Sequence, residues 1–254
     1  MSRMKIFSSL FFSLLICIAC SSETESATET TSNEGGITQD SLVQNVEKPK
    51  FNPENIFDAP IVDEFEFKGD LVSAYWWEDE NHANYLINSI LRTEDEEGWP
   101  SAYLFSYHYT KVDTSIKLLR LVQDFEESCD FDITLEFLGK PSITDLNGDN
   151  VAEVAIIYRK ACRSDVSECA MKLIMHDDEN KYALRGSQYI VFPDEQQPTN
   201  YQYDLSKADK DDDIPEWLDF RGRYENAKDF EGADASFLTL ADSIWRSNAF
   251  ERFD

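Results

Sequence analysis

Residues 131–160 read FDITLEFLGKPSITDLNGDNVAEVAIIYRK, and this stretch decides the fold class. Residues 131–137 alternate apolar and polar side chains, which is the pattern of a strand with one buried face. The run 154–158, VAIIY, is apolar throughout and predicts a central strand that is covered on both faces. The polar segment between these two runs is short, so we expect an antiparallel pair of strands joined around it.

Strand-like runs also occur on both sides of this stretch. Runs rich in Tyr, Phe, Ile, Leu and Val predict further strands, and short linkers with Asp, Asn, Gly or Ser favour hairpins over βαβ crossovers. The predicted strands cover residues 67–77, 83–91, 102–110, 115–122, 131–138, 152–160, 170–176 and 181–190. The sequence therefore predicts a mainly β fold built as an antiparallel meander. A sandwich, a barrel and a partial propeller all remain open.

A C-terminal helix is predicted at residues 234–248. Asp234 can cap its N-terminus, and apolar residues recur with helical spacing, so the helix is expected to pack on an open face of the sheet. Its apolar face carries Phe237, Leu240, Ala241, Ile244 and Trp245. A shorter helix with Trp217, Phe220 and Tyr224 on one face is expected in the proline-interrupted region that precedes it.

The first 19 residues predict a secretory signal peptide. Arg3 and Lys5 precede an uncharged, mostly apolar run at residues 6–19, which is shorter than the roughly 20 residues of a membrane-spanning helix. The segment Cys17-Ile18-Ala19-Cys20 resembles the lipobox of bacterial lipoproteins, although Cys17 stands where Leu is usual. An ordinary secretory signal that leaves a soluble product is the alternative.

The lipobox resemblance implies where in the cell the chain is located. It implies cleavage before Cys20, acylation of that cysteine, palmitate included, and anchoring in the membrane by the attached lipids. Ser21 rather than Asp after the cysteine implies delivery to the outer membrane of the cell envelope. Residues 20–50 are rich in Ser, Thr and Glu and lack aromatic residues, which predicts a disordered acidic tether. Residues 51–254 are then expected to form a single β-rich domain.

The charge of the chain excludes one class of partner. Lys and Arg together number 23 against 50 Asp and Glu, a formal net charge of −27. Such a surface repels phosphate backbones, so no nucleic acid is expected as a partner. It attracts divalent cations, but adaptation to a high-salt habitat would give the same composition.

The motif with the most specific chemistry is DLNGDNVAE at residues 145–153. Side-chain oxygens recur at alternate positions of a short loop, and Ca²⁺ requires six to eight oxygen ligands. The segment resembles the calcium loops of FG-GAP and VCBS-type extracellular repeats, with Asn150 where those repeats prefer Gly. On that resemblance the ligands of a structural Ca²⁺ are Asp145, Asn147, Asp149 and Glu153. The backbone carbonyl of Val151 is expected to complete the loop's share of ligands, together with water. The alternative is a hairpin turn at Asn147-Gly148 with solvated acids around it.

Over a longer stretch the chain also resembles small Gram-negative surface lipoproteins. The segments that carry this resemblance are ITDLNGD at 143–149, ACRSDVS at 161–167 and MKLIM at 171–175. Some members of that group are labelled surface polysaccharide biosynthesis proteins, a label that names a process without a mechanism.

The cysteines predict one disulfide. With Cys20 acylated, Cys129, Cys162 and Cys169 remain, and two of them should pair in an oxidising compartment. Cys129 and Cys162 are expected to face each other at the open end of the hairpin around Asp145, while Cys162 with Cys169 is the rival pair. A zinc site is disfavoured because no CxxC occurs. The histidines, all far apart in sequence, are His82, His108 and His176.

No motif of a known catalytic centre is present, and no catalytic residue is predicted. The nucleophile elbow, the phosphate-binding loop, the HExxH zinc motif and the dinucleotide fingerprint are all missing from the sequence. Adjacent Trp76 and Trp77 should point to opposite faces of a strand, so one of them is expected to be buried. Five bases on predicted strands are expected to balance neighbouring acids: Lys117, Arg120, Arg159, Lys160 and Arg163.

These observations lead to one main hypothesis. The chain is expected to be a membrane-anchored envelope lipoprotein whose calcium-stabilised β domain has a non-enzymatic accessory or binding role, with a glycan or an envelope protein as partner. Handling of surface polysaccharide is the process that the lipoprotein resemblance suggests. Two alternatives remain: an envelope glycan hydrolase with an unidentified carboxylate pair, which a raised pKa in a cleft would indicate, and an assembly factor, which an exposed apolar patch would indicate.

Overall fold

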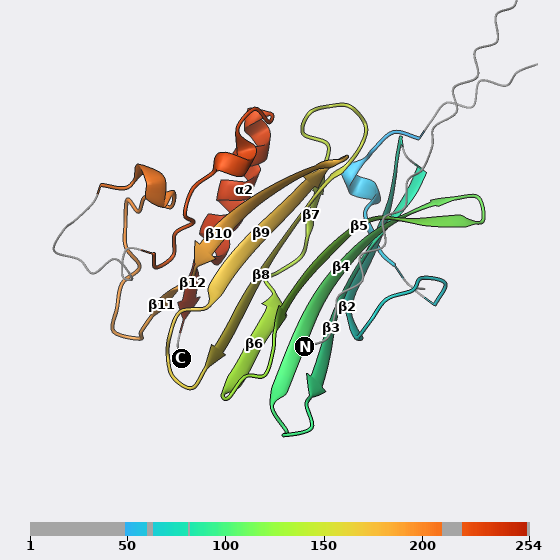
Figure 1. The fold of residues 1–254 in the computed structure, drawn as a ribbon. Coiled ribbons are helices and arrows are strands. Elements are labelled where there is room, and N and C mark those ends of the chain that lie inside the picture. Colours follow the sequence, from blue (N-terminus) through green and yellow to red (C-terminus); the bar gives the residue numbers. More distant parts are fainter. Residues whose placement is uncertain (1–48, 60–62, 81, 210–219, 253–254) are drawn as a thin grey trace, which may run out of the picture. The chain divides into compact units, whose positions relative to one another are not determined.

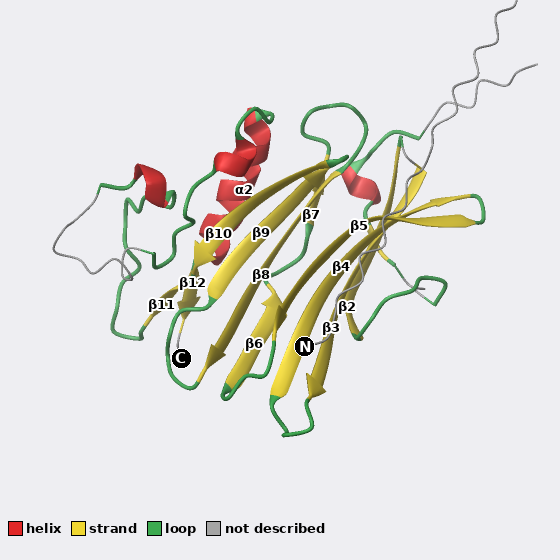
Figure 2. Cartoon of the chain, in the orientation of Figure 1, coloured by secondary structure: helices red, strands yellow, loops and turns green. Residues whose placement is uncertain are grey.

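The structure is a computed structural model (Figures 1 and 2) that describes residues 49–59, 63–80, 82–209 and 220–252. The chain divides into two units, residues 1–45 and residues 46–254, and every described residue belongs to the second unit. The predicted signal peptide, Cys20, the tether up to residue 48, and Trp217 lie outside the described residues. None of the helices within the described ranges is long and apolar enough to cross a membrane.

The first sheet has five antiparallel strands in sequence order. A single 3₁₀ turn, η1 (Pro53–Asn55), precedes them. The strands are β1 (Phe57–Asp58), β2 (Asp70–Asp79), β3 (His82–Glu94), β4 (Pro100–Val112) and β5 (Ser115–Glu126). Strands β2 to β5 confirm four of the predicted runs. Strand β1 was not predicted, because two residues are too short to show a periodic pattern.

The second sheet is also antiparallel and contains the stretch that decides the fold class. Its order is β10 (Asn180–Ser187), β9 (Ala170–Asp177), β8 (Glu153–Arg163) and β6 (Asp132–Phe137), and β7 (Ser142–Thr144) also pairs with β8. The expected pair of strands around the Asp145 loop is confirmed as β6 and β8. VAIIY lies in β8 between two neighbours and is buried along its length, as its uniform apolar character predicted.

The two sheets pack face to face over a shared core. Side chains of the first sheet such as Trp77 and Leu104 contact side chains of the second sheet such as Ile156 and Leu135 in one buried cluster. The outer face of the first sheet is covered in part by the segment that carries Phe65 and Phe67. This packing resolves the alternatives left open by the sequence in favour of two stacked antiparallel sheets.

The predicted C-terminal helix is confirmed as α2 (Ala235–Asn248), and Figure 1 shows it lying against the second sheet. The Asp234 carboxylate accepts a hydrogen bond from the backbone N–H of Ser236 at 2.8 Å, so it caps the helix as expected. Phe237, Ala241 and Trp245 are buried against the outer face of this sheet. The helix therefore seals the face that points away from the first sheet.

The region between β10 and α2 differs from its prediction. The expected strand at 181–190 is two strands, because the chain leaves β9 after Ser187 and continues as β11 (Tyr189–Val191), which pairs in parallel with β12 (Phe250–Arg252). At Gly186 a Cβ would lie only 1.9 Å from the carbonyl oxygen of Arg223, so only glycine permits the crossing of these two segments.

The expected short helix around residue 220 is wrong where it can be judged. Phe220 lies in a turn and Tyr224 forms isolated β-bridges with Gly186 and Asp204. The described helical turns of this region are η2 (Leu205–Lys207) and η3 (Lys228–Phe230), each only three residues long. Tyr224 is instead buried in the cluster between α2 and the second sheet, where its ring contacts that of Trp245 of α2 edge to face at 5.5 Å.

Candidate functional site

The loop between β7 and β8 carries the predicted ion ligands. The Asp145 carboxylate accepts hydrogen bonds from the backbone N–H groups of Gly148 at 2.8 Å and Asn150 at 3.1 Å. Gly148 and Asn150 both have positive φ, 76° and 65°. Asn is one of the few residues that adopts this conformation readily, so Asn150 fulfils the role of the glycine that calcium loops prefer at this position.

Asn147 and Asp149 lie together in the middle of the loop. The Asn147 amide group donates to Asp149 Oδ2 at 3.0 Å, and its carbonyl oxygen accepts from the backbone N–H of Asp149 at 2.9 Å. Asp149 Oδ1 accepts from the backbone N–H of Val151 at 2.8 Å. The side-chain oxygens at loop positions 1, 3 and 5 therefore hold the loop's own backbone in a tight turn.

Glu153 is the buried member of the predicted set. It is 0 % exposed, and its Oε2 accepts from the backbone N–H of Leu146 at 2.9 Å and from the Thr144 hydroxyl at 3.1 Å. Its Oε1 is buried and has no hydrogen-bond partner within the described part of the chain. Burial raises the pKa of Glu153 above its ordinary value, and the hydrogen bonds from Leu146 and Thr144 oppose this only in part.

The donor set of this loop fits a hard cation. A buried carboxylate oxygen without a partner is costly, and a bound cation would compensate that cost. The oxygens of Asp145, Asn147 and Asp149 that accept N–H groups each retain a second lone pair. Within the described ranges, however, no three His, Cys, Asp or Glu side chains are gathered in the geometry of a metal site. The ligand set would thus rely on the Asn147 amide and a backbone carbonyl as well as on carboxylates.

The loop also joins the two sheets. The backbone N–H of Ala152 donates to Asp79 Oδ2 at 3.1 Å, and the same oxygen accepts from the indole N–H of Trp77 at 3.2 Å. The backbone N–H of Glu80 donates to the carbonyl of Asn150 at 2.9 Å. Asp79 and Glu80 lie at the end of β2, so the conformation of this loop is coupled to the first sheet.

A cavity of about 380 Å³ opens beside the loop. Its walls come from both sheets and from the loop itself. It is lined by Asp79, Asn84, His108, Thr110, Val112, Lys117, Leu119, Arg120, Val151, Ala152, His176, Asp178 and Glu179. A volume of this size is at the lower end of the range of small-molecule sites. The cavity is thus large enough to enclose a small ligand.

A β-bulge shapes the wall that β5 contributes. The register of β4 and β5 shifts between His108 and Tyr109, where Arg120 pairs with His108 and Leu118 with Tyr109. Consecutive residues of a regular strand point to opposite faces, but the extra residue at the bulge lets Leu119 and Arg120 both line the cavity. The sequence contains no signal for this bulge, so the cavity could not be assembled from the predicted strands alone.

The bases on strands behave in two ways. Arg159, Lys160 and Arg163 form ion pairs, which confirms the expectation that they balance acids. Arg120 is different: its guanidinium donates to the carbonyl oxygens of Leu119 and Asp178. Neither Lys117 nor Arg120 forms an ion pair with a described carboxylate, so for these two the expectation was wrong.

Two histidines line the same cavity although they are 68 residues apart in sequence. His108 Nε2 lies 3.1 Å from Asn84 Oδ1, and its ring packs on that of Trp77. Burial, with the charges of His176 and Arg120, lowers the pKa of His108 to about 3. Burial likewise lowers the pKa of His176 to about 4, with contributions from Lys181 and Arg120. Both rings are therefore neutral at pH 7.

The predicted disulfide between Cys129 and Cys162 is present, with a Cα–Cα distance of 5.7 Å. The geometry differs from the expected ladder, because Cys162 pairs with Ile133 and Cys129 lies in a turn before β6. Cys169 is a free thiol that is 0 % exposed, and burial raises its pKa. It is therefore an unreactive core residue rather than a nucleophile.

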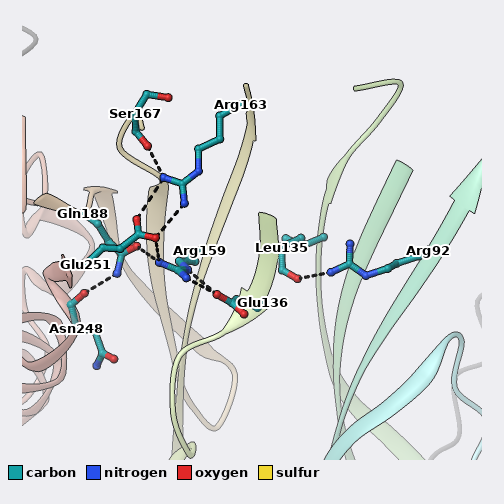
Figure 3. A network of polar contacts seen from close by, with 9 residues as sticks. All are labelled: Arg92, Leu135, Glu136, Arg159, Arg163, Ser167, Gln188, Asn248 and Glu251. Carbon is teal, nitrogen blue, oxygen red and sulfur yellow. Dashed lines mark hydrogen bonds and ion pairs between the residues drawn. The ribbon is translucent and has the colours of Figure 1, made fainter. Parts of the chain in front are cut away.

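The neighbourhood of this disulfide is held by the arginine network in Figure 3, which converges on Glu251. Arg159 and Arg163 of β8 lie 2.8 Å and 2.9 Å from Glu251 Oε1, and Arg159 also pairs with Glu136 at 2.6 Å. Gln188 bridges Arg159 to the carbonyl of Asn248. Because Arg159 and Arg163 of β8 are both paired with Glu251 of β12, these three residues fix β12 to the second sheet.

A hydrolase would be indicated by a carboxylate with a raised pKa inside the cavity, and the described residues do not show this combination. The two described acids with raised pKa values, Glu153 and Asp177, do not line the cavity.

Trp77 is 0 % exposed in the core, and half-buried Trp76 stacks on Phe57 at 5.2 Å, so the expectation of one buried indole is confirmed. Exposed large apolar side chains occur on several elements, and three of them, Leu118, Leu121 and Phe125, lie on edge strand β5.

The fold and site together define a class: an antiparallel two-sheet β domain with one face sealed by a helix and a cavity beside a DxNxD loop. Comparisons with models of known protein families, with curated proteins and with solved structures found no match.

Proposed function

We propose that the protein is a lipid-anchored lipoprotein of the cell envelope whose β domain binds a structural Ca²⁺ at residues 145–153 and has a non-enzymatic binding role. The observation that carries the ion site is the buried carboxylate of Glu153, whose Oε1 has no partner among the described residues. Position 9 of the loop is where the calcium-loop resemblance places an acidic ligand. The lipobox resemblance at Cys20 supports the anchor.

The ligand chemistry supports calcium over other cations. Asp145, Asn147, Asp149 and Glu153 provide oxygen atoms alone, and the carbonyl of Val151 would add another. Hard cations with flexible coordination prefer such a set, and water completes the six to eight ligands of Ca²⁺. Bound Ca²⁺ would supply positive charge to a loop of acids, and the chain's own residues would supply the turn that holds it.

The role proposed for the ion is to stabilise the conformation of the loop. The loop is hydrogen-bonded to Asp79 and Glu80 of the first sheet while its stem belongs to the second. Fixing the loop would fix the ends of both sheets and the cavity wall that Val151 and Ala152 contribute. The binding role rests on that cavity, and the lipoprotein resemblance suggests surface polysaccharide handling as its setting. A hydrolase is not proposed, because no described carboxylate with a raised pKa lines the cavity.

Calorimetric titration of the full chain with CaCl₂, after removal of divalent ions by a chelator, tests this function. Wild type is expected to bind one Ca²⁺ saturably. The variant with Asp145→Ala and Asp149→Ala should lose that binding. A matched control with Asp130→Ala and Asp165→Ala removes the same charge from exposed positions outside the loop and should retain it. Equal Ca²⁺ binding by both double variants would show that binding depends on overall surface charge and would overturn the ion site.

A further inference from the structure

We propose that the cavity beside the loop binds the anionic group of a small organic molecule, with Arg120 as its charge partner. The inference deepens the proposed binding role by naming a ligand class and a site. It does not require the calcium ion, because the groups that would contact the anion lie on β4, β5 and β9 rather than in the loop.

Arg120 differs in its partners from the other half-buried arginines of the strands. Arg159 and Arg163 are half-buried arginines on strands, as Arg120 is, and each is paired with Glu251. Among the described residues, Arg120 has two hydrogen-bond partners, and both are backbone carbonyls. A guanidinium has five N–H donors and retains its charge at all physiological pH values. The chain has 50 acidic residues, yet Arg120 forms no ion pair with a described carboxylate. A half-buried guanidinium of this kind that lines a cavity can bind an anion there.

The side chains at the inner end of the cavity also favour an anion. His108, Arg120 and His176 also line a smaller cavity of about 10 Å³ that is otherwise formed by Ser106 and apolar side chains. No carboxylate lies among the described residues that line this inner end. The ring nitrogens of His176 are buried and have no hydrogen-bond partner within the part of the chain that the structure describes. A neutral imidazole donates one hydrogen bond and accepts another. The imidazoles of His108 and His176 therefore add hydrogen-bond donors next to the permanent positive charge of Arg120.

The opening of the cavity limits the ligand further. Asp178 and Glu179 are exposed at the β9–β10 turn and line the cavity together with Lys117. Their carboxylates disfavour a second negative charge on the ligand and can accept hydrogen bonds from hydroxyl groups. The volume of about 380 Å³ suits a molecule of one sugar ring. The class that fits is therefore a hydroxylated monoanion such as a sugar acid.

Calorimetric titration of the full chain with glucuronate, and with glucose as its uncharged counterpart, tests this inference. Wild type should bind glucuronate saturably and glucose at least tenfold more weakly. Arg120→Gln should weaken glucuronate binding about tenfold or more, the usual effect of losing a charged hydrogen bond. Arg92→Gln is the matched control, because Arg92 also donates to a backbone carbonyl, that of Leu135, but lies outside the cavity lining.

A second variant protects the test against misfolding of Arg120→Gln. Lys117 is exposed, so Lys117→Gln should fold normally and weaken glucuronate binding a few-fold. Failure of wild type to bind glucuronate, equal binding of glucose, or unchanged binding in both variants would overturn the inference. Each titration is run with calcium and with chelator. Glucuronate binding by a protein that binds no Ca²⁺ in the CaCl₂ titration would overturn only the ion site. Binding of Ca²⁺ by a protein that does not bind glucuronate would overturn only the cavity assignment.

Discussion

The backbone N–H of Leu146 donates to Oε2 of Glu153 at 2.9 Å, so a buried carboxylate at the start of β8 holds the loop that precedes it. The other oxygen of that carboxylate has no partner in the described structure. A negative charge in such a place destabilises the fold unless a cation or a proton compensates it. This relationship links the sequence motif to the stability of the domain, because the same residue is a strand residue, a loop clamp and the proposed ion ligand.

Removal of the Glu251 carboxylate should destabilise the domain. Glu251→Gln leaves the half-buried charges of Arg159 and Arg163 without their shared partner, and the loss of charged hydrogen bonds is expected to cost about 1–3 kcal/mol. Urea denaturation followed by fluorescence measures this change in unfolding free energy. Glu231→Gln, at an exposed position of the same charge, should change it by less than about 0.5 kcal/mol. Equal midpoints for the two variants would contradict the role of the network.

The disulfide should contribute strongly to stability. Cys129 and Cys162 are separated by 33 residues, and closure of a loop of that length is expected to stabilise the domain by about 3–4 kcal/mol. The variant with Cys129→Ala and Cys162→Ala, or wild type under reducing conditions, should show this loss in urea denaturation. A reduced protein that unfolds at the same urea concentration as the oxidised one would be incompatible with a structural disulfide.

Truncation of Trp245 should release α2 from the sheet. The side chain is 0 % exposed, and its indole N–H donates to the carbonyl of Gly222 at 3.0 Å. Trp245→Ala is therefore expected to lose about 3–5 kcal/mol of unfolding free energy. Hydrogen exchange should show faster exchange in α2 than in the first sheet of the same variant. Ser243→Ala, on the exposed side of the helix, serves as the control and should leave both properties unchanged.

Stability should fall with pH below about 6.5 because of the cavity histidines. Their folded pKa values, about 3 for His108 and about 4 for His176, are lower than the ordinary value of 6.5, so the unfolded chain binds more protons between these limits. The stability is fully present above pH 6.5 and is lost progressively as the pH falls toward 4. Urea midpoints at pH 7.0 and 4.5 measure the slope, and His108→Gln should reduce it. An identical slope in that variant would show that other groups dominate acid unfolding.

The parts of the fold with strong local patterns were predictable. The alternation at 131–137, the apolar run at 154–158 and the capped helix after Asp234 appear as a strand or a helix near the predicted positions, because a period of two or of 3.6 residues records which face is buried. Phe131 is the exception, since it precedes β6 and is 53 % exposed. Strands β1, β7 and β12 were missed because two or three residues carry no period. The disulfide partners were predicted correctly, although Cys129 lies outside the ladder that was expected to position it.

The cavity was not predictable for a different reason. His108, Arg120 and His176 meet through a bulge and through the packing of two sheets, and neither leaves a local signature in the sequence. The histidines were discounted because they are far apart along the chain, and sequence distance says little about residues on stacked strands. The loop was visible because its chemistry is local: five consecutive alternate positions carry its proposed ligands.

Thermal denaturation of wild type and of Glu153→Gln, each with excess calcium and with excess chelator, tests the central claim most directly. At a calcium concentration about 100 times the dissociation constant, wild type is expected to melt about 5 °C or more higher than in chelator. Glu153→Gln retains the shape of the side chain without its charge and should melt at nearly the same temperature in both conditions. No calcium-dependent shift in wild type, or an equal shift in Glu153→Gln, would contradict the proposed calcium site.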